Sequence, residues 1–185
     1  MTKIKLFLLV LLMSSISISS FAGGKIGVRA GYQMSNLYYD GSSMDNPFNS
    51  FYIGAFKEKK IIPMLHFGVG LEYSLSGSYI DNDNKLVMHY LSVPVNVKFK
   101  IGPFYATAGA SASFKVGEKW TVKGIDTELI EKANVFDVPV FAGVGFQILM
   151  IRVEARYYWG TMSLYDNKLD PFKTQNLQLG LALAI

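Results

Sequence analysis

The 185-residue sequence contains no cysteine. This absence excludes a disulfide framework, a cysteine-ligated metal site and the lipidated N-terminal cysteine of a bacterial lipoprotein. Charge is also scarce, because Lys, Arg, Asp and Glu make up only 17% of the chain. Setting aside the two lysines of the N-terminal leader leaves 16 basic and 14 acidic residues. So small an excess argues against a nucleic-acid-binding protein.

Long apolar runs are missing from most of the chain. After the leader, no stretch approaches the roughly 20 consecutive apolar residues of a membrane-spanning helix. The leader has two lysines, an apolar run at 6–13 and small residues up to Ala22, which is typical of a cleavable signal peptide. We therefore predict a signal peptide at 1–22 and a mature domain at 23–185. An uncleaved anchor is the alternative, which the shortness of the apolar run disfavours.

Aromatic residues and glycine are abundant, at 14% and 17 residues, and apolar residues alternate with small or polar ones along the mature chain. Within residues 65–76, every odd position is large and apolar, whereas the even positions are His, Gly, Glu or Ser. Strands are predicted at 24–38, 49–57, 64–77, 87–100, 103–116, 134–148, 151–163 and 174–185. Long polar connections are predicted at 39–48, 78–86, 117–133 and 164–173, and they alternate with shorter turns. This organisation predicts an all-β fold, an eight-stranded antiparallel up-and-down transmembrane β-barrel with both termini on the periplasmic side.

A soluble, lipocalin-like barrel also alternates, but with its apolar face inward. The apolar face here carries roughly 40 side chains, more than the interior of an eight-stranded barrel can hold. The other face is Gly, Ser, Ala and Gln with a few charges, and it lacks the dense Lys and Glu coat of a water-facing surface. The apolar face is therefore predicted to contact lipid. Aromatic residues such as Tyr52, Tyr73 and Tyr90 near the loop ends, and Phe99 near a turn end, are predicted to form two interfacial belts.

Four short motifs, taken in order, resemble the PorT-like outer-membrane β-barrel family of Bacteroidetes. They are KIGVRAGY at 25–32, YLSVPV at 90–95 with Lys98 in step, ARY at 155–157 and QLGL at 178–181. The resemblance implies a small outer-membrane barrel of the OmpA or OmpX kind, and a role in protein secretion or at the cell surface. Two positions depart from the family pattern. Ser92 stands where an acidic residue is frequent, and the chain ends in Ile185 rather than an aromatic residue.

Charged residues gather on the predicted inner face. Because an unpaired charge in a narrow lumen is costly, Glu72 and Glu154 are predicted to pair with two or more of Arg29, Lys98 and Arg156. The favoured interpretation is a lumen closed by salt bridges, and the alternative is an ion path. The predicted cluster consists of Arg29, Glu72, Lys98, Arg152, Glu154 and Arg156, with Lys115 and Asp137 nearer the loop end.

The sequence predicts neither catalysis nor a cofactor. The only two histidines, His66 and His89, are predicted on opposite faces and at opposite ends of the barrel, and Ser92 faces away from His89. No Ser–His–acid set converges, so an outer-membrane lipid-modifying enzyme is a minor alternative. Two separated histidines do not make a metal site.

Two features are candidate partner surfaces. Small residues at 106, 108, 110 and 112 alternate along the outer face of one strand, where they would permit close approach within a membrane; a thin lipid-facing wall is the alternative. The stretch 117–134 contains Trp120 and a sequence at 126–133 suited to a helical turn, and it either binds a partner or covers the barrel mouth. The residues of these surfaces are Ala106, Ala108, Ala110, Ala112 and Trp120.

The leading hypothesis is a non-enzymatic barrel with a structural or partner-binding role. Such a barrel could be a component of an envelope or protein-secretion assembly. Its expected surroundings are phospholipid and lipopolysaccharide, with an envelope protein as a candidate partner and no metal, cofactor or nucleic acid. Lys57, Lys59 and Lys60 lie where anionic head groups are expected, although solubility explains them equally well. The main alternative is a small surface or transport barrel with weak permeability.

Overall fold

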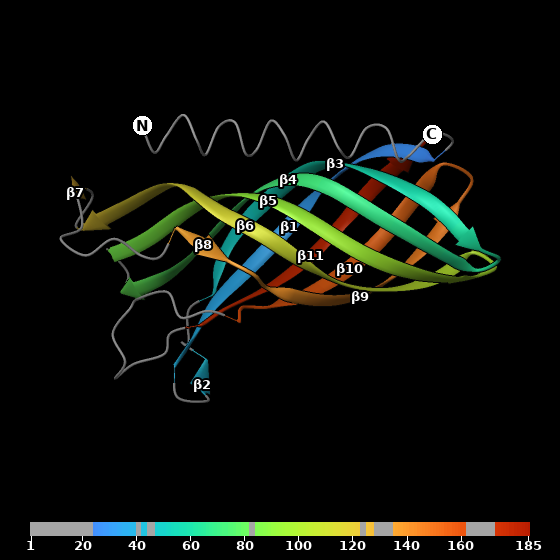
Figure 1. Cartoon of the computed structure of the whole chain (residues 1–185). Coiled ribbons are helices and arrows are strands. Elements are labelled where there is room, and N and C mark those ends of the chain that lie inside the picture. Colours follow the sequence, from blue (N-terminus) through green and yellow to red (C-terminus); the bar gives the residue numbers. More distant parts are fainter. Residues whose placement is uncertain are drawn as a thin grey trace, which may run out of the picture.

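A computed structural model describes residues 24–39, 42–43, 47–81, 84–122, 125–127, 135–161 and 173–185. The predicted signal peptide at 1–22 lies outside this part of the chain. Within the described ranges, no helix is long and apolar enough to cross a membrane. Eight strands form the wall in Figure 1: β1 (Lys25–Tyr39), β3 (Phe48–Ile62), β4 (Leu65–Asp81), β5 (Asn84–Ile101), β6 (Phe104–Val122), β9 (Val140–Ile148), β10 (Ile151–Trp159) and β11 (Lys173–Ala184).

Antiparallel pairing closes the wall. Each strand pairs with its neighbours in the chain, and β1 pairs with both β3 and β11, so the first and last strands meet. Three short strands near the loop end also pair with the wall: β2 (Ser42–Ser43) with β1, and β7 (Ile125–Thr127) and β8 (Phe136–Asp137) with β6. The prediction of a closed, eight-stranded, up-and-down barrel is confirmed.

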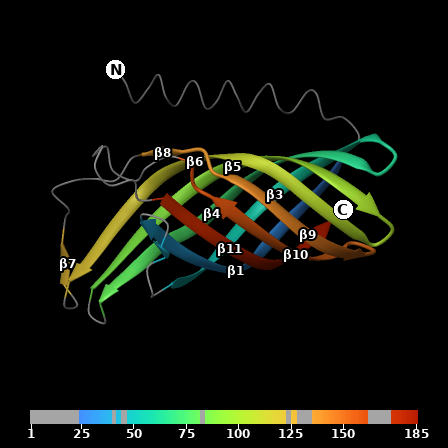
Figure 2. The ribbon, with the colours of Figure 1, turned by 90° about the horizontal axis from the view of Figure 1, so that it is seen from below.

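The strands tilt because the ladder is staggered. Following hydrogen-bonded partners once round the wall from Ile26 leads back to β1 at Asn36, ten residues further along. A stagger of this size gives an eight-stranded barrel its steep strand tilt and a narrow interior. The tilt is visible in both ribbon views (Figures 1 and 2).

Burial is inverted relative to a soluble protein. Large apolar side chains are exposed on the outer face of the wall, for example Ile53 on β3 and Val144 on β9, which is 63% exposed. Polar and charged side chains are buried inside, and the largest of them, Arg156, is 1% exposed. The apolar face therefore contacts lipid, as predicted, and the lipocalin-like alternative is wrong.

Tyrosines on the outer face mark the loop-side membrane boundary. The hydroxyl of Tyr32 donates to Asn49 Oδ1 at 2.5 Å, and the hydroxyl of Tyr73 hydrogen-bonds with Nδ1 of His89 at 2.6 Å. Such a side chain, with an apolar ring and a polar tip, suits the boundary between hydrocarbon and head groups. Two predicted belt residues are placed differently, because Tyr52 and Tyr90 are buried in the lumen.

Several predicted loops are in fact strand. β3 continues to Ile62 through the predicted turn, and β4 and β5 leave only residues 82–83 between them where a loop at 78–86 was predicted. β6 continues to Val122, so that β4, β5 and β6 extend past the loop ends of their neighbours (Figure 2). The polar residues of these stretches suggested loops, but the backbone pairing between neighbouring strands continues through them.

The predicted helical turn at 126–133 is wrong at its start, since Asp126 and Thr127 belong to β7; residues 128–134 lie outside the described part. The predicted strand at 134–148 is interrupted between β8 and β9 at Val138 and Pro139. Proline has no N–H to donate to the ladder, but its carbonyl still accepts a hydrogen bond from the Ser111 N–H at 2.9 Å.

Candidate functional site: the lumen and the outer wall

Arg156 on β10 is the centre of an ionic layer in the middle of the lumen. Its Nη2 lies 2.9 Å from Glu72 Oε2, and its Nη1 donates to the Tyr158 hydroxyl at 2.7 Å. Gln178 donates to the other oxygen of Glu72 at 2.8 Å, so both carboxylate oxygens are occupied. In the strand order, β10 and β4 lie on opposite sides of the barrel. The Arg156–Glu72 pair therefore crosses the lumen.

Glu154 joins this layer to Arg29. Its Oε1 lies 3.5 Å from Arg29 Nη1 and 3.4 Å from Arg156 Nε, and its Oε2 accepts a hydrogen bond from the Tyr105 hydroxyl at 3.0 Å. The Arg29 guanidinium also stacks on the Phe56 ring, 4.5 Å from its centroid. Aromatic faces thus help to hold the arginines in a space with little water.

A second ionic layer lies nearer the turn end, around Glu58. This side chain is 6% exposed, and one of its oxygens binds Lys98 while the other lies 2.8 Å from Arg152 Nη2. Oε1 of Gln147 accepts from Arg152 Nε at 3.1 Å and from Lys100 Nζ at 2.8 Å. These side chains come from β3, β5, β9 and β10, so this layer also reaches across the lumen.

The structure brings the six residues of the predicted charge cluster together in the lumen and adds Glu58 to them. Arg29 and Arg156 pair with Glu72 and Glu154, whereas Lys98 and Arg152 pair with Glu58. Sequence reasoning missed Glu58 because it ended the strand at residue 57. The signal was present, since Glu58 shares the inward register of Tyr52 and Phe56. The two residues predicted nearer the loop end bind locally: Lys115 pairs with Glu118, and Asp137 Oδ1 accepts from the Val138 N–H at 2.8 Å.

The loop-side half of the lumen is lined mainly by neutral hydroxyls and amides. Ser92 donates to Ser113 at 2.9 Å, and Gln33 donates to the Leu75 carbonyl at 2.7 Å and to Ser76 at 3.0 Å. At Ser92, where the family resemblance implied an acid, the lumen is therefore neutral. The cavity in this half measures about 30 Å³, room for about two water molecules.

The histidines do not assemble a catalytic set. His89 contacts Tyr73 on the outer face, whereas the Ser92 side chain is buried inside. His66 lies on β4 beside the turn end, opposite Lys98 in the ladder. Among the described residues, no group of three or more His, Cys, Asp or Glu side chains could hold a metal ion.

The predicted alanine stripe lies on the outer wall and widens into a hollow. Ala106 and Ala108 on β6, Ala142 on β9 and Ala155 on β10 line it, and Val144 of β9 lies between Ala106 and Ala155 in the ladder. Its sides are Val97 and Phe99 on β5, and Tyr157 and Leu177 on β10 and β11. Ala110 and Ala112 continue the outer register of β6 beyond this hollow. The backbone of Trp120 pairs with β5 and β7, and its side chain lies outside the described part.

Comparison with known proteins agrees with this architecture. The family model described as outer membrane protein beta-barrel domain matches residues 20–183. The chain belongs to this family. No curated protein matches the sequence significantly.

Two solved structures show how far the likeness extends. Neisserial surface protein A is similar over 85% of this chain and 96% of its own, with a TM-score of 0.61 and 15% identity. Ail, the attachment invasion locus protein of Yersinia pestis, whose structure was solved in complex with the heparin analogue sucrose octasulfate, covers 89% of this chain and 100% of its own, with a TM-score of 0.54 and 18% identity. At such identities the likeness shows the fold alone.

Proposed function

We propose that this outer-membrane barrel is a closed, non-enzymatic wall protein that acts through its surfaces, in a structural or partner-binding role. The observation that carries the proposal is the Arg156–Glu72 pair, which crosses the lumen between opposite strands at 2.9 Å. A second crossing at Glu58 lies nearer the turn end. An ion passing through would have to separate both sets of buried pairs, which is strongly unfavourable in a narrow lumen.

The orientation follows from the strand count. An even number of strands places both termini at one end, beside the short turns, and barrels of this type have their short turns on the periplasmic side. We therefore propose that residues 1–22 are a signal peptide and that the longer loop-side strands face outward, among lipopolysaccharide. The motifs at 25–32, 90–95 and 178–181 support a place in the PorT-like group of Bacteroidetes. For a barrel of that group, the structural or partner-binding role that we propose is in an envelope or protein-secretion assembly.

The alanine hollow is the proposed contact for a membrane-spanning partner. Where Ala108 and Ala142 pair across β6 and β9, two small side chains let a neighbouring backbone approach more closely than the nearby Val, Phe and Leu side chains allow. Within a bilayer, close packing of small residues is a main source of attraction between spanning segments, because burial of apolar surface contributes little there.

Co-purification tests this contact. The barrel is extracted from its native membrane in a mild detergent, as the unmodified chain, as Ala108→Phe and as Val28→Phe, which adds an outward ring on β1 away from the hollow. We expect a partner to accompany the unmodified chain and Val28→Phe, and to be lost from Ala108→Phe. Recovery of all three as monomers contradicts the partner-binding role, and equal loss from both variants contradicts the position of the contact.

A small transport barrel with weak permeability is the second candidate. It is favoured by one observation: the salt bridges of the two layers join four cations to three acids, namely Arg29, Lys98, Arg152 and Arg156 to Glu58, Glu72 and Glu154. A net positive lumen would prefer anions if it opened. Conductance distinguishes this candidate from the closed wall.

A further inference from the structure

Lysines surround the turn-end mouth of the lumen. Lys25 on β1, Lys60 on β3 and Lys100 on β5 all lie in the inward register of their strands, within a few residues of a turn or of the first strand's start. The ladder places Lys25 opposite Glu58, and Lys60 opposite His66 on the strand between β3 and β5. Three cations on neighbouring parts of the wall therefore converge on one opening.

Nearby acids do not neutralise these lysines. Glu58 is the adjacent carboxylate, and its two oxygens are already bound to Lys98 and Arg152. Among the described residues, no carboxylate lies within 4.0 Å of the Nζ atoms of Lys25, Lys60 or Lys100. Lys100 has a neutral partner, since it donates a hydrogen bond to Gln147 Oε1 at 2.8 Å. The mouth therefore carries unneutralised positive charge.

Apolar turns set the height of this mouth in the membrane. The turn tips expose large apolar side chains to the outside, among them Leu149, which is 87% exposed, together with Ile61, Met64, Ile101 and Ile185. From Ile151 to Trp159 in the loop-side belt, β10 extends about 26 Å along the strand, or about 20 Å along the barrel axis at a usual tilt. With the two turn residues that precede Ile151, the apolar span is close to the apolar band of an outer-membrane barrel. The turn tips therefore lie at the turn-side edge of the hydrocarbon layer.

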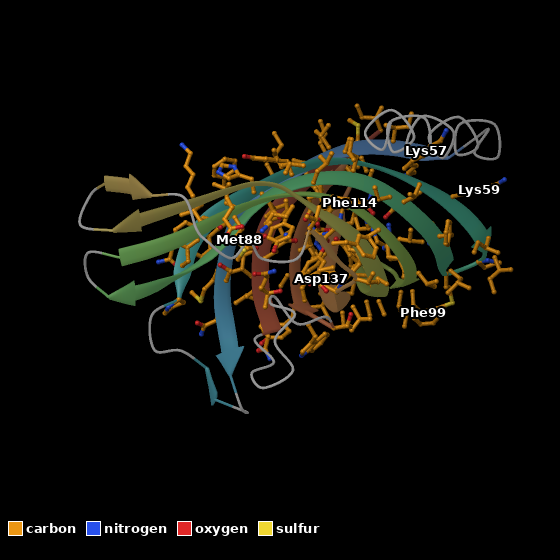
Figure 3. The ribbon with its side chains drawn as sticks, turned by 60° about the vertical axis from the view of Figure 1, so that its left-hand side comes forward. Lys57, Lys59, Met88, Phe99, Phe114 and Asp137 are labelled. Carbon is orange, nitrogen blue, oxygen red and sulfur yellow. The ribbon has the colours of Figure 1, made fainter. Side chains whose placement is uncertain are left out.

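The lysines are thus at the level of lipid head groups. In Figure 3, Lys57, Lys59 and Phe99 are labelled toward the right of the view, and Met88, Phe114 and Asp137 lie to their left. The anions concentrated at this level of a bilayer are phospholipid phosphates, and each lysine near such a surface adds to the attraction.

We propose that Lys25, Lys60 and Lys100 form a binding site for the phosphate-bearing head group of an anionic phospholipid. The exposed isoleucine and methionine side chains of the turns contact the acyl chains of the same lipid, so a head group anchored in the bilayer is the occupant rather than free phosphate. The site does not depend on the proposed partner contact or on closure of the lumen, and its test has a different readout from both.

Lipid selectivity measured by electron spin resonance tests the site. The folded mature barrel is reconstituted in phosphatidylcholine vesicles containing a trace of spin-labelled phosphatidylglycerol or, in parallel, spin-labelled phosphatidylcholine. We expect the unmodified barrel to prefer the anionic lipid by about fivefold or more. In the triple variant Lys25→Gln/Lys60→Gln/Lys100→Gln, the preference should fall close to one. The matched control Lys85→Gln/Lys119→Gln/Lys173→Gln removes the same charge at the loop end and should keep it.

Three outcomes would overturn the proposal. The first is an undiminished preference for the anionic lipid in the turn-end variant. The second is an equal decrease in the loop-end control, which would indicate an effect of net charge alone. The third is displacement of the labelled lipid by inorganic phosphate, which would indicate a site for the free anion. A Lys25→Arg/Lys60→Arg/Lys100→Arg variant, which keeps the charges, should restore the preference. Folding of each variant is checked by heat-dependent mobility in gel electrophoresis, so that a misfolded protein is not scored as loss of binding.

Discussion

The two halves of the lumen are lined by different chemistry. From the middle of the barrel to the turn end, buried arginine, lysine and glutamate side chains pair across the interior. Towards the loop end, serine and glutamine side chains make neutral hydrogen bonds around a cavity for about two water molecules. Both halves occupy the same eight-stranded wall, so the difference lies in the inward-facing residues alone.

The two halves are expected to differ in how well they tolerate substitution. A buried ion that loses its partner retains its charge without solvent, whereas a hydroxyl that loses its partner can turn to another hydroxyl or to water. The ionic half therefore tolerates few changes, and the hydroxyl half tolerates more. The same reasoning explains why the guanidinium of Arg156, which is 1% exposed, has a carboxylate and a tyrosine hydroxyl as partners.

The largest expected effect comes from the ionic half. Arg156→Met removes the partner of Glu72 and leaves a buried carboxylate held only by Gln178, so we expect a loss of about 3–5 kcal/mol in the free energy of unfolding. The measurement is a urea titration of the barrel in lipid or detergent, followed by tryptophan fluorescence. The double variant Glu72→Met/Arg156→Met removes both charges and should recover most of the loss. A single variant that loses less than about 1 kcal/mol would contradict the importance of the pair.

The smallest expected effect comes from the hydroxyl half. Ser92→Ala removes one donor to Ser113, which still contacts Ser111 at 3.5 Å, and should cost about 0.5–1.5 kcal/mol in the same titration. The double variant Ser92→Ala/Ser113→Ala should cost no more than the two single changes combined, because both hydroxyls of the pair are removed and Ser111 loses only a 3.5 Å contact. If it costs as much as Arg156→Met, the two halves do not differ as described.

Much of the fold could be predicted from the sequence because the alternation of large apolar and small or polar residues is a property of each strand alone. The volume of the apolar face then determined which side meets lipid. Strand ends could not be predicted in the same way. At Asp81 and Val122 the residues are polar or leave the apolar pattern, yet both pair with Asn84. Where a strand ends therefore depends on its partner strand and not on its own pattern alone.

The candidate site was predicted in part for the same reason. Arg29, Glu72 and Arg156 could be placed inside from their register, but their partners depend on which strands face each other across the lumen. Glu58 lies just beyond the predicted strand end at residue 57, whereas β3 continues to Ile62, and the position of Tyr52 near a strand end indicated the outer belt although its side chain is buried. The alanine hollow could be predicted only in part. Ala106 and Ala108 alternate along one strand, but Ala142 and Ala155 lie near them because β9 and β10 pair beside that strand.

The central claim is that the ionic half closes the barrel, and single-channel recording tests it most directly. The purified, folded protein is inserted into planar bilayers, with insertion verified independently and a larger-lumen porin recorded as a positive control. We expect no stable conductance steps from the unmodified barrel, since the Arg156–Glu72 and Glu58 layers both cross the lumen. Stable, reproducible steps from the unmodified barrel would contradict the claim and favour the transport barrel.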